Sequence, residues 1–175
     1  ERLPASFELA FAAMALAVVI AIPLGIWSAV KRNTFIDILI SGISVLGKAM
    51  PNFWMGIMLI LLFSVMLGWF PVSGRGGVTH LILPAITLGV SLSAQMTRLI
   101  RSNMLEILNQ DYIRTARSKG IFELFVIGKH AFRNGLIPVV TIMSLQFTSL
   151  IGGTLITETV FAWPGLGQLL VSAVN

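Results

Sequence analysis

Residues 42–49 come close to a nucleotide-binding motif. They read G-x-x-x-x-G-K-A, and a phosphate-binding P-loop differs only at the last position, where a Ser or Thr hydroxyl holds the magnesium ion. Ala49 has no hydroxyl, no strand pattern precedes the segment, and the flanking residues form an apolar, helix-like run. The sequence therefore predicts that this chain binds no cofactor of its own. If ATP drives this protein, the nucleotide and its magnesium ion belong to another chain.

Other residues that could do chemistry are few. The chain has no cysteine, which excludes disulfides, thiol chemistry and cysteine-based metal sites. His80 and His130 lie far apart with no carboxylate at ligand spacing, so no metal site is expected. None of the seven acidic residues falls at the middle of an apolar span, where ion-coupled carriers usually hold an ionisable group. The sequence predicts no catalytic residues, and it weakens the alternative of a secondary carrier without removing it.

The composition indicates an all-α integral membrane protein. Charged residues make up 11% of the chain and hydrophobic residues 56%, whereas soluble domains carry about 25% charged residues. A chain of 175 residues is too short to hide so much apolar surface in one core. Seven of the twelve basic residues fall between Arg98 and Arg133. They are not interleaved with stacking aromatics as in nucleic-acid binders, so they indicate a cytoplasmic loop and no nucleic-acid partner.

About four full membrane spans are expected from the rule that a helix needs roughly 20 apolar residues to cross the hydrocarbon layer. A further segment, residues 34–50, carries Asp37 and Lys48 and is predicted to be interfacial or oblique, with a break at Pro51. Lys31 and Arg32 place the end of the first span in the cytoplasm. The four spans cover residues 7–30, 52–70, 81–100 and 136–157.

Small residues recur at every fourth position of the first span. They predict a face that lets another helix approach closely, and ordinary alanine richness is the alternative. The residues are Ala13, Ala17, Ala21, Gly25 and Ala29.

The fourth span is unusually polar, which favours contact with other helices or an aqueous path over contact with lipid. Gln146 and Ser149 are candidates for lining that path. Residues 158–168 then break the helix with a proline and two glycines, as expected of a re-entrant or outer cap. For Glu158, a helix-end position at the outer interface is favoured over a role in substrate passage.

Residues 103–134 are expected to form a cytoplasmic loop with two short helices, 111–119 and 122–133. Asp111 is predicted to be the N-cap of the first helix, and Gly120 to end it in the left-handed conformation. The second helix exposes several apolar side chains within a basic rim. Such a patch needs a protein partner or the membrane surface, and a partner is favoured.

This loop resembles the coupling loop of binding-protein-dependent ABC importer permeases, in the first-subunit branch of the dipeptide/oligopeptide/nickel group. The family pattern is Glu-Ala-Ala, three residues, Gly, then nine residues before Ile-x-Leu-Pro. Arg114-Thr115-Ala116 fills the first position and Gly120 the glycine. His130, Phe132 and Arg133 depart from the later part, as is typical of the peptide/nickel group. Further matches are Trp69-Phe70-Pro71, Leu83-Pro84 and the run Glu158-Thr159-Val160-Phe161-Ala162-Trp163-Pro164-Gly165-Leu166-Gly167.

The resemblance implies the type I ABC importer permease fold, with residues 1–175 as a single transmembrane domain incomplete at both ends. In such importers the coupling loop sits in a groove of the nucleotide-binding subunit. Ala116 and Gly120 are then expected to dock tightly, with Arg114, Thr115, Arg117 and Lys119 around them. A solute-binding protein is expected to dock near Arg75 and residues 163–165, which makes Trp163 a candidate for the outer gate.

The resemblance also implies the partners and the setting. It predicts a non-catalytic subunit in a bacterial or archaeal plasma (inner) membrane, spanning the bilayer several times. The expected partners are two ABC ATPase subunits, a second homologous permease and an extracytoplasmic solute-binding protein. Relatives of this group handle dipeptides, longer peptides, nickel or glutathione, so the solute stays open. A secondary carrier or channel, and a membrane scaffold that holds anionic lipid, are the alternative functions.

Overall fold

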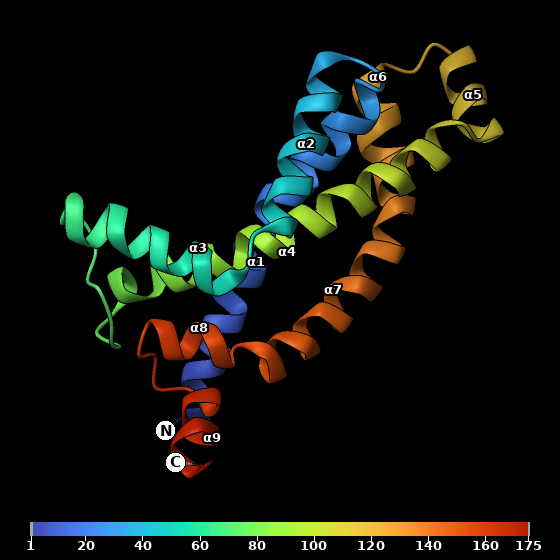
Figure 1. Ribbon diagram of the computed structural model, residues 1–175. Coiled ribbons are helices and arrows are strands. Elements are labelled where there is room, and N and C mark those ends of the chain that lie inside the picture. Colours follow the sequence, from blue (N-terminus) through green and yellow to red (C-terminus); the bar gives the residue numbers. More distant parts are fainter. Residues whose placement is uncertain (1, 175) are drawn as a thin grey trace.

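A computed structural model describes residues 2–174, with the side chains of residues 2–150 and 154–170 (Figure 1). Glu1 and Asn175 lie outside the described residues. Over residues 2–174 the chain is helical between short turns and has no strand, which confirms the all-α expectation.

The helices α1 (Arg2–Val30) and α4 (Val78–Leu108) form the most extensive helix pair and contribute much of the core. The predicted small-residue face of α1 is confirmed, because all five of its residues are buried. At Gly25 an added Cβ would lie 2.7 Å from the Cβ of Ile100 on α4. The two backbones therefore approach more closely there than any larger side chain would permit.

The chain between α1 and α4 forms a sharply bent pair of helices. α2 (Phe35–Ala49) ends before Pro51, and α3 (Asn52–Leu59) continues into the π-helical segment η1 (Ile60–Met66) at 99° to α2. The predicted break at Pro51 is therefore confirmed, and residues 42–49 are helical rather than a phosphate-binding loop. The expected span over residues 52–70 is too long, because the helix stops at Met66 and Gly68 turns the chain with a φ of 64°.

Among the described residues, α1 and α4 are each long and apolar enough to cross a membrane, and the bent pair would add a third span. α7 (Arg133–Gly153) has 21 residues and occupies the place of the expected fourth span. It ends earlier than expected because a short helix, α8 (Leu155–Val160), follows Thr154. A last helix, α9 (Leu166–Val174), follows Pro164, and its side chains after Leu170 lie outside the described residues.

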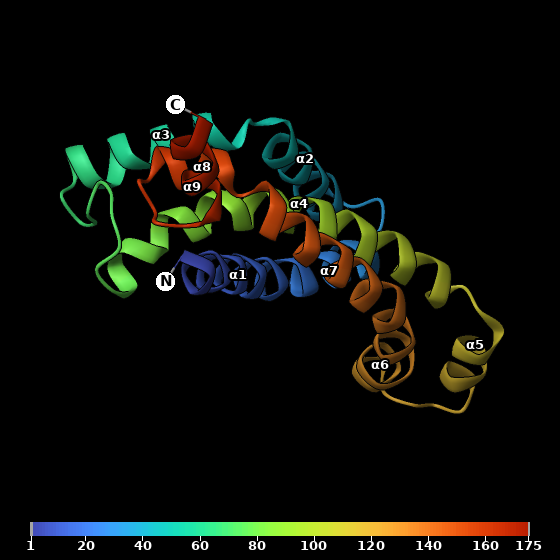
Figure 2. The same ribbon diagram turned by 90° about the horizontal axis from the view of Figure 1, so that it is seen from below.

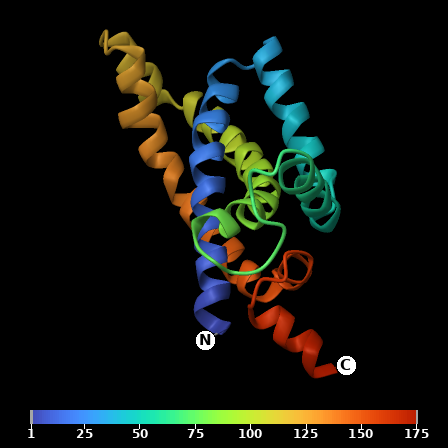
Figure 3. The same cartoon turned by 90° about the vertical axis from the view of Figure 1, so that its left-hand side faces the viewer.

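The start of α1 and the end of α9 lie at the same end of the bundle (Figures 1 and 3). The turn between α1 and α2, with Lys31 and Arg32, lies at the opposite end, as does α5 (Asp111–Ser118). We call this opposite end the α5 end. These two basic segments are therefore gathered on one side, as the expected cytoplasmic placement of Lys31, Arg32 and the 103–134 loop requires.

The segment after α4 differs from expectation in two ways. Gln110, with extended backbone, occupies the N-cap position of α5, so the prediction of Asp111 as N-cap is wrong. α6 (Glu123–Phe125) passes through the π-helical segment η2 (Val126–Phe132) directly into α7, so the second short helix is the start of a long one. The left-handed conformation of Gly120 is confirmed by its φ of 71°.

The close approach of α1 and α4 gives a first prediction. Gly25→Ala places a Cβ against Ile100 and should lower the free energy of unfolding by about 1–3 kcal/mol. The matched control is Gly42→Ala on α2, where an added Cβ meets no atom within 4 Å. Thermal unfolding of the purified protein in detergent should show a lower midpoint for Gly25→Ala alone. Equal midpoints for both variants would contradict the close packing.

Candidate functional site

Residues 111–132, which we call the coupling unit, stand apart from the bundle at the α5 end (Figure 2). They are nevertheless packed onto it. Ile113 and Ala116 of α5 belong to the same buried cluster as Val126 and Ala131 of η2 and Met104 of α4. This apolar base makes the coupling unit an extension of α4 and α7 rather than a flexible loop.

The predicted coupling residues fall into two groups. The exposed group, which is available to a partner, consists of Arg114, Thr115, Arg117, Lys119 and Gly120. Ala116 is only 7% exposed and faces the chain's own core. Any effect of Ala116 on docking would therefore come from holding α5 in place, and the contact of all these residues with a partner stays a prediction.

Arg117 closes the turn around Gly120. Its Nη2 atom donates to Glu123 Oε1 at 2.7 Å and its Nε atom to Oε2 at 3.1 Å. These hydrogen bonds stabilise the ionised carboxylate and hold the pKa of Glu123 below its ordinary value. Arg117 was expected at the rim of a docking surface, and here it fixes the position of α6 relative to α5.

An apolar patch lies on the outside of the coupling unit. Phe122, Leu124 and Phe125 are between 63% and 73% exposed. We call these three residues the docking patch. Three large adjacent apolar side chains beside basic residues mark an interaction surface rather than ordinary solvent-exposed surface.

A buried ion pair ties three helices together near the same end. Asp37 of α2 is 4% exposed and accepts hydrogen bonds from Arg101 on α4, Nε to Oδ1 at 2.6 Å and Nη2 to Oδ2 at 2.8 Å. It also accepts from Ser28 Oγ of α1 at 2.5 Å and from the Asn33 backbone N–H at 3.0 Å. All of these donors suit an ionised carboxylate, so both oxygens of Asp37 are fully hydrogen-bonded.

No local pattern indicates this pair, because Asp37 and Arg101 are 64 positions apart. The available signal was an acidic residue, Asp37, inside one apolar segment and a basic residue, Arg101, directly after another. Ionisable residues in such places usually pair with one another.

The outer cap is organised around Glu158, which is fully buried in α8. Its Oε1 atom accepts from Ser6 Oγ of α1 at 2.7 Å and from Thr154 Oγ1 at 2.8 Å, and its Oε2 atom accepts from the Gly167 backbone N–H at 2.8 Å. Glu158 thus lies near the end of a short helix in the outer cap, as favoured, but its carboxylate is enclosed by protein, and its depth in the membrane stays a prediction. An added Cβ at Gly165 would collide with this carboxylate, which explains a glycine there.

Trp163 seals the same cap. Its ring is fully buried, and its Nε1 atom donates to the Ala5 carbonyl of α1 at 2.9 Å. The guanidinium of Arg75 lies 5.8 Å from the centre of the Trp163 ring and is also paired with Glu8 at 2.6 Å. The structure thus brings Arg75 and the 163–165 turn together, as the expected docking area for a binding protein requires.

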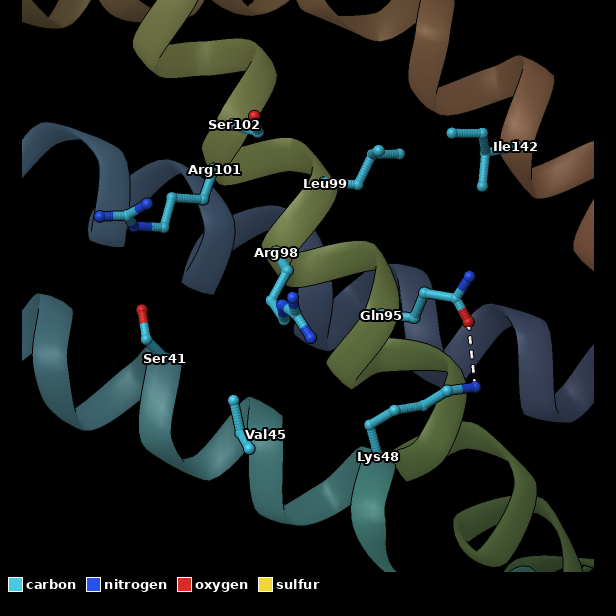
Figure 4. A pocket seen from close by; sticks show the side chains of 9 residues that line it. All are labelled: Ser41, Val45, Lys48, Gln95, Arg98, Leu99, Arg101, Ser102 and Ile142. Atoms are coloured by element: carbon cyan, nitrogen blue, oxygen red, sulfur yellow. Dashed lines mark hydrogen bonds between the residues drawn. The ribbon is translucent and has the colours of Figure 1, made fainter.

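Two cavities lined in part by polar side chains lie between α2, α4 and α7. The larger has a volume of about 720 Å³, and Figure 4 shows the side chains that line it. We call it the large cavity, and its lining residues are Ser41, Val45, Lys48, Gln95, Arg98, Leu99, Arg101, Ser102 and Ile142.

The small cavity, of about 160 Å³, shares Lys48 with the large one and is lined on its polar side by Asn52, Ser91, Gln146 and Ser149. The two candidate path residues on α7, Gln146 and Ser149, therefore face a common polar space. The other two candidates, Glu158 and Trp163, line neither cavity and belong to the outer cap.

The fold matches a solved inward-facing structure of the MetNI methionine ABC transporter. The TM-score is 0.76 with 20% sequence identity, over 94% of this chain and 74% of the matched chain. This likeness shows a shared fold, the expected one of type I ABC importer permeases.

The sequence comparisons define the family. Residues 21–175 match the family described as the binding-protein-dependent transport system inner membrane component, and the chain belongs to it. It is 47% identical to the oligopeptide transport system permease protein AppB of Bacillus subtilis (strain 168), over 98% of this chain and 58% of that protein. It is also 47% identical to the glutathione transport system permease protein GsiC of Escherichia coli (strain K12), over 100% of this chain and 57% of that protein. The chain thus spans a little over half the length of these relatives.

The outer cap gives a second prediction. Glu158→Ala leaves Ser6, Thr154 and the Gly167 N–H without their acceptor and should lower the free energy of unfolding by about 3 kcal/mol. The cap should also become sensitive to protease. Glu8→Ala, which removes an exposed partner of Arg75, is the control and should change neither property strongly. A Glu158→Ala protein as stable and as protease-resistant as the control would refute the role given to this carboxylate.

Proposed function

We propose that this chain is the transmembrane part of a permease subunit in an ATP-driven, binding-protein-dependent importer. It passes a peptide-like or related small solute from an extracytoplasmic binding protein to the cytoplasm by alternating access. The observation that carries the proposal is the coupling unit, an exposed docking patch fixed on a buried apolar base at the end of α4. A rigid projection of this kind can transmit the movement of a bound partner to the membrane-spanning helices.

In this proposal the partner at the coupling unit is an ABC ATPase subunit, which also holds the ATP and magnesium. The apolar contact with the ATPase is made by the docking patch, Phe122, Leu124 and Phe125. The polar rim around it is formed by Arg114 and Lys119. The permease itself is non-catalytic. Closure of two ATPase subunits would move two coupling units, one on this chain and one on a second homologous permease.

The opposite end would receive the solute. The buried cap around Glu158 and Trp163 forms a firm base, and Arg75 lies on it beside the ring of Trp163. This combination supports the docking of an extracytoplasmic binding protein at Arg75 and the 163–165 turn. Gln146 and Ser149 would then line the route inward through the small cavity.

The setting follows from the family, whose members are inner membrane components. We place the α5 end in the cytoplasm of a bacterium or archaeon, because the basic residues concentrate there. The relatives are named for the transport of oligopeptides and of glutathione, which supports a peptide-like solute for this chain.

The function is tested by uptake into proteoliposomes. The full-length protein would be reconstituted with its second permease, ATPase and binding protein, and glutathione or trialanine uptake measured. We expect uptake only with ATP and the ATPase, and uptake by this protein alone on an ion gradient would establish the secondary carrier instead.

Phe122→Asp gives the matching variant test, because a charge in the docking patch would have to be buried against the ATPase. Co-purification of the ATPase should fall at least tenfold. The control is Val72→Asp, an exposed apolar position in the loop between η1 and α4, which should leave co-purification unchanged. Normal ATPase recovery with Phe122→Asp would favour a membrane scaffold over a coupled permease.

A further inference from the structure

The large cavity holds positive charge that the described residues do not neutralise. Its three cations are Lys48, Arg98 and Arg101, and its lining contains no acidic residue. Arg101 is paired with Asp37. Arg98 makes no hydrogen bond or ion pair within the described part of the chain, and the Lys48 side chain bonds there only to the neutral Gln95, Nζ to Oε1 at 3.1 Å. Two cationic groups therefore face the cavity without a counter-charge.

Polar residues that line the two cavities follow one face of α4, with Ser91 in the small cavity and the others in the large one. Ser91, Gln95, Arg98 and Ser102 are spaced by four, three and four residues, which places them on one side of a helix. Across from them, Lys48 comes from α2. Figure 4 shows Arg98 directed into the space between the two helices and the Lys48 side chain extending to Gln95. Exposed cations on spanning helices are costly in lipid, so such residues usually face water or a partner charge.

The charged groups of the cavity are all hydrogen-bond donors, and its side-chain acceptors are the Ser41 and Ser102 hydroxyls and the Gln95 oxygen. The Gln95 side-chain oxygen is already occupied by Lys48, which leaves its NH₂ group free to donate. Arg98 presents a planar guanidinium that suits two-point binding of a carboxylate. A volume of about 720 Å³ lies within the usual range of about 300–1,000 Å³ for small-molecule sites.

We propose that the large cavity is a transit site for an anionic solute, with Arg98 and Lys48 binding a carboxylate and Gln95 donating to a neighbouring carbonyl. This inference rests on the proposed function and narrows its substrate class. A free peptide or glutathione carries a carboxylate and fits the site. A divalent cation such as nickel would be repelled by two uncompensated positive charges.

Two other sources could supply the anion. A lipid phosphate could reach Arg98 from the bilayer, and a carboxylate of the second permease could close the cavity as an interface. We favour the solute because the donors line a cavity of ligand size, and because Lys48 also lines the small cavity beside Gln146 and Ser149. The experiments below separate the three sources.

The first experiment measures the cavity's charge and water access without any solute. Residues 1–175 contain no cysteine. Ser102→Cys therefore adds a single thiol to the cavity lining, provided that cysteines elsewhere in the complex are replaced. The assembled transporter is labelled with anionic sulfonatoethyl methanethiosulfonate and with its cationic trimethylammonioethyl analogue. Arg98→Gln should lower the anionic-to-cationic rate ratio roughly fivefold to tenfold. Arg32→Gln, an exposed cation outside the lining, should leave the ratio unchanged.

Two labelling results would overturn the proposal. Absence of reaction with either reagent would mean that the cavity is closed by the second permease or by lipid. A rate ratio that does not respond to Arg98→Gln would mean that its charge is already neutralised in the complex.

The second experiment measures ATP-driven uptake of trialanine and glutathione. Arg98→Gln should reduce uptake at least tenfold while ATPase assembly is retained, and Arg98→Lys should restore part of it because the charge returns. Equal uptake by Arg98→Gln and wild type would reject the carboxylate site while leaving the proposed function intact. Absence of ATP-driven uptake by wild type would reject the proposed function, and the labelling result would still decide the charge of the cavity. If the Arg98→Gln defect disappears in vesicles without anionic lipid, the ligand is a lipid phosphate and the proposal is wrong.

Discussion

The close approach of α1 and α4 is the constraint on which the other features depend. At Gly25 the two helices leave no room for a Cβ, so the backbone of α4 is held against α1 along one side. The opposite, polar side of α4 is thereby turned toward α2 and α7, where the cavities lie. The Asp37–Arg101 pair then fixes α2 to this unit near the α5 end. A change in the α1–α4 distance would disturb both the cavities and the ion pair.

The same helix connects the cavities to the coupling unit. α4 extends without a break from Val78 to Leu108, about 46 Å at 1.5 Å per residue, and its last turns pack on η2. Ile113 and Val126 are buried in the contact, so the coupling unit has no independent freedom at its base. Displacement by a partner should therefore move α4 and its polar face together. The structure supports a lever that acts as one body, which is the central claim of the proposed mechanism.

Local patterns predicted the features that depend on local chemistry. The small-residue face of α1 and the left-handed Gly120 follow from spacing and from backbone sterics. The hydrogen bond of Glu158 to Ser6 joins positions 152 residues apart, and no local pattern in one sequence specifies such a partner. Ala116 was expected to dock against a partner, but its side chain is buried within this chain. The packing of α5 against η2 decides which face of this short helix is buried, and the local sequence does not specify that packing.

The most direct test of the one-body lever is a distance measured by pulsed electron paramagnetic resonance. Spin labels at Lys119→Cys and Val19→Cys would report the coupling unit and the exposed side of α1 in the assembled, reconstituted transporter. A second pair would join Lys119→Cys to the equivalent coupling loop of the second permease. The account predicts that trapping ATP changes the distance between the two coupling loops and leaves the Lys119–Val19 distance unchanged. A shift in the Lys119–Val19 distance as large as that between the coupling loops would contradict it.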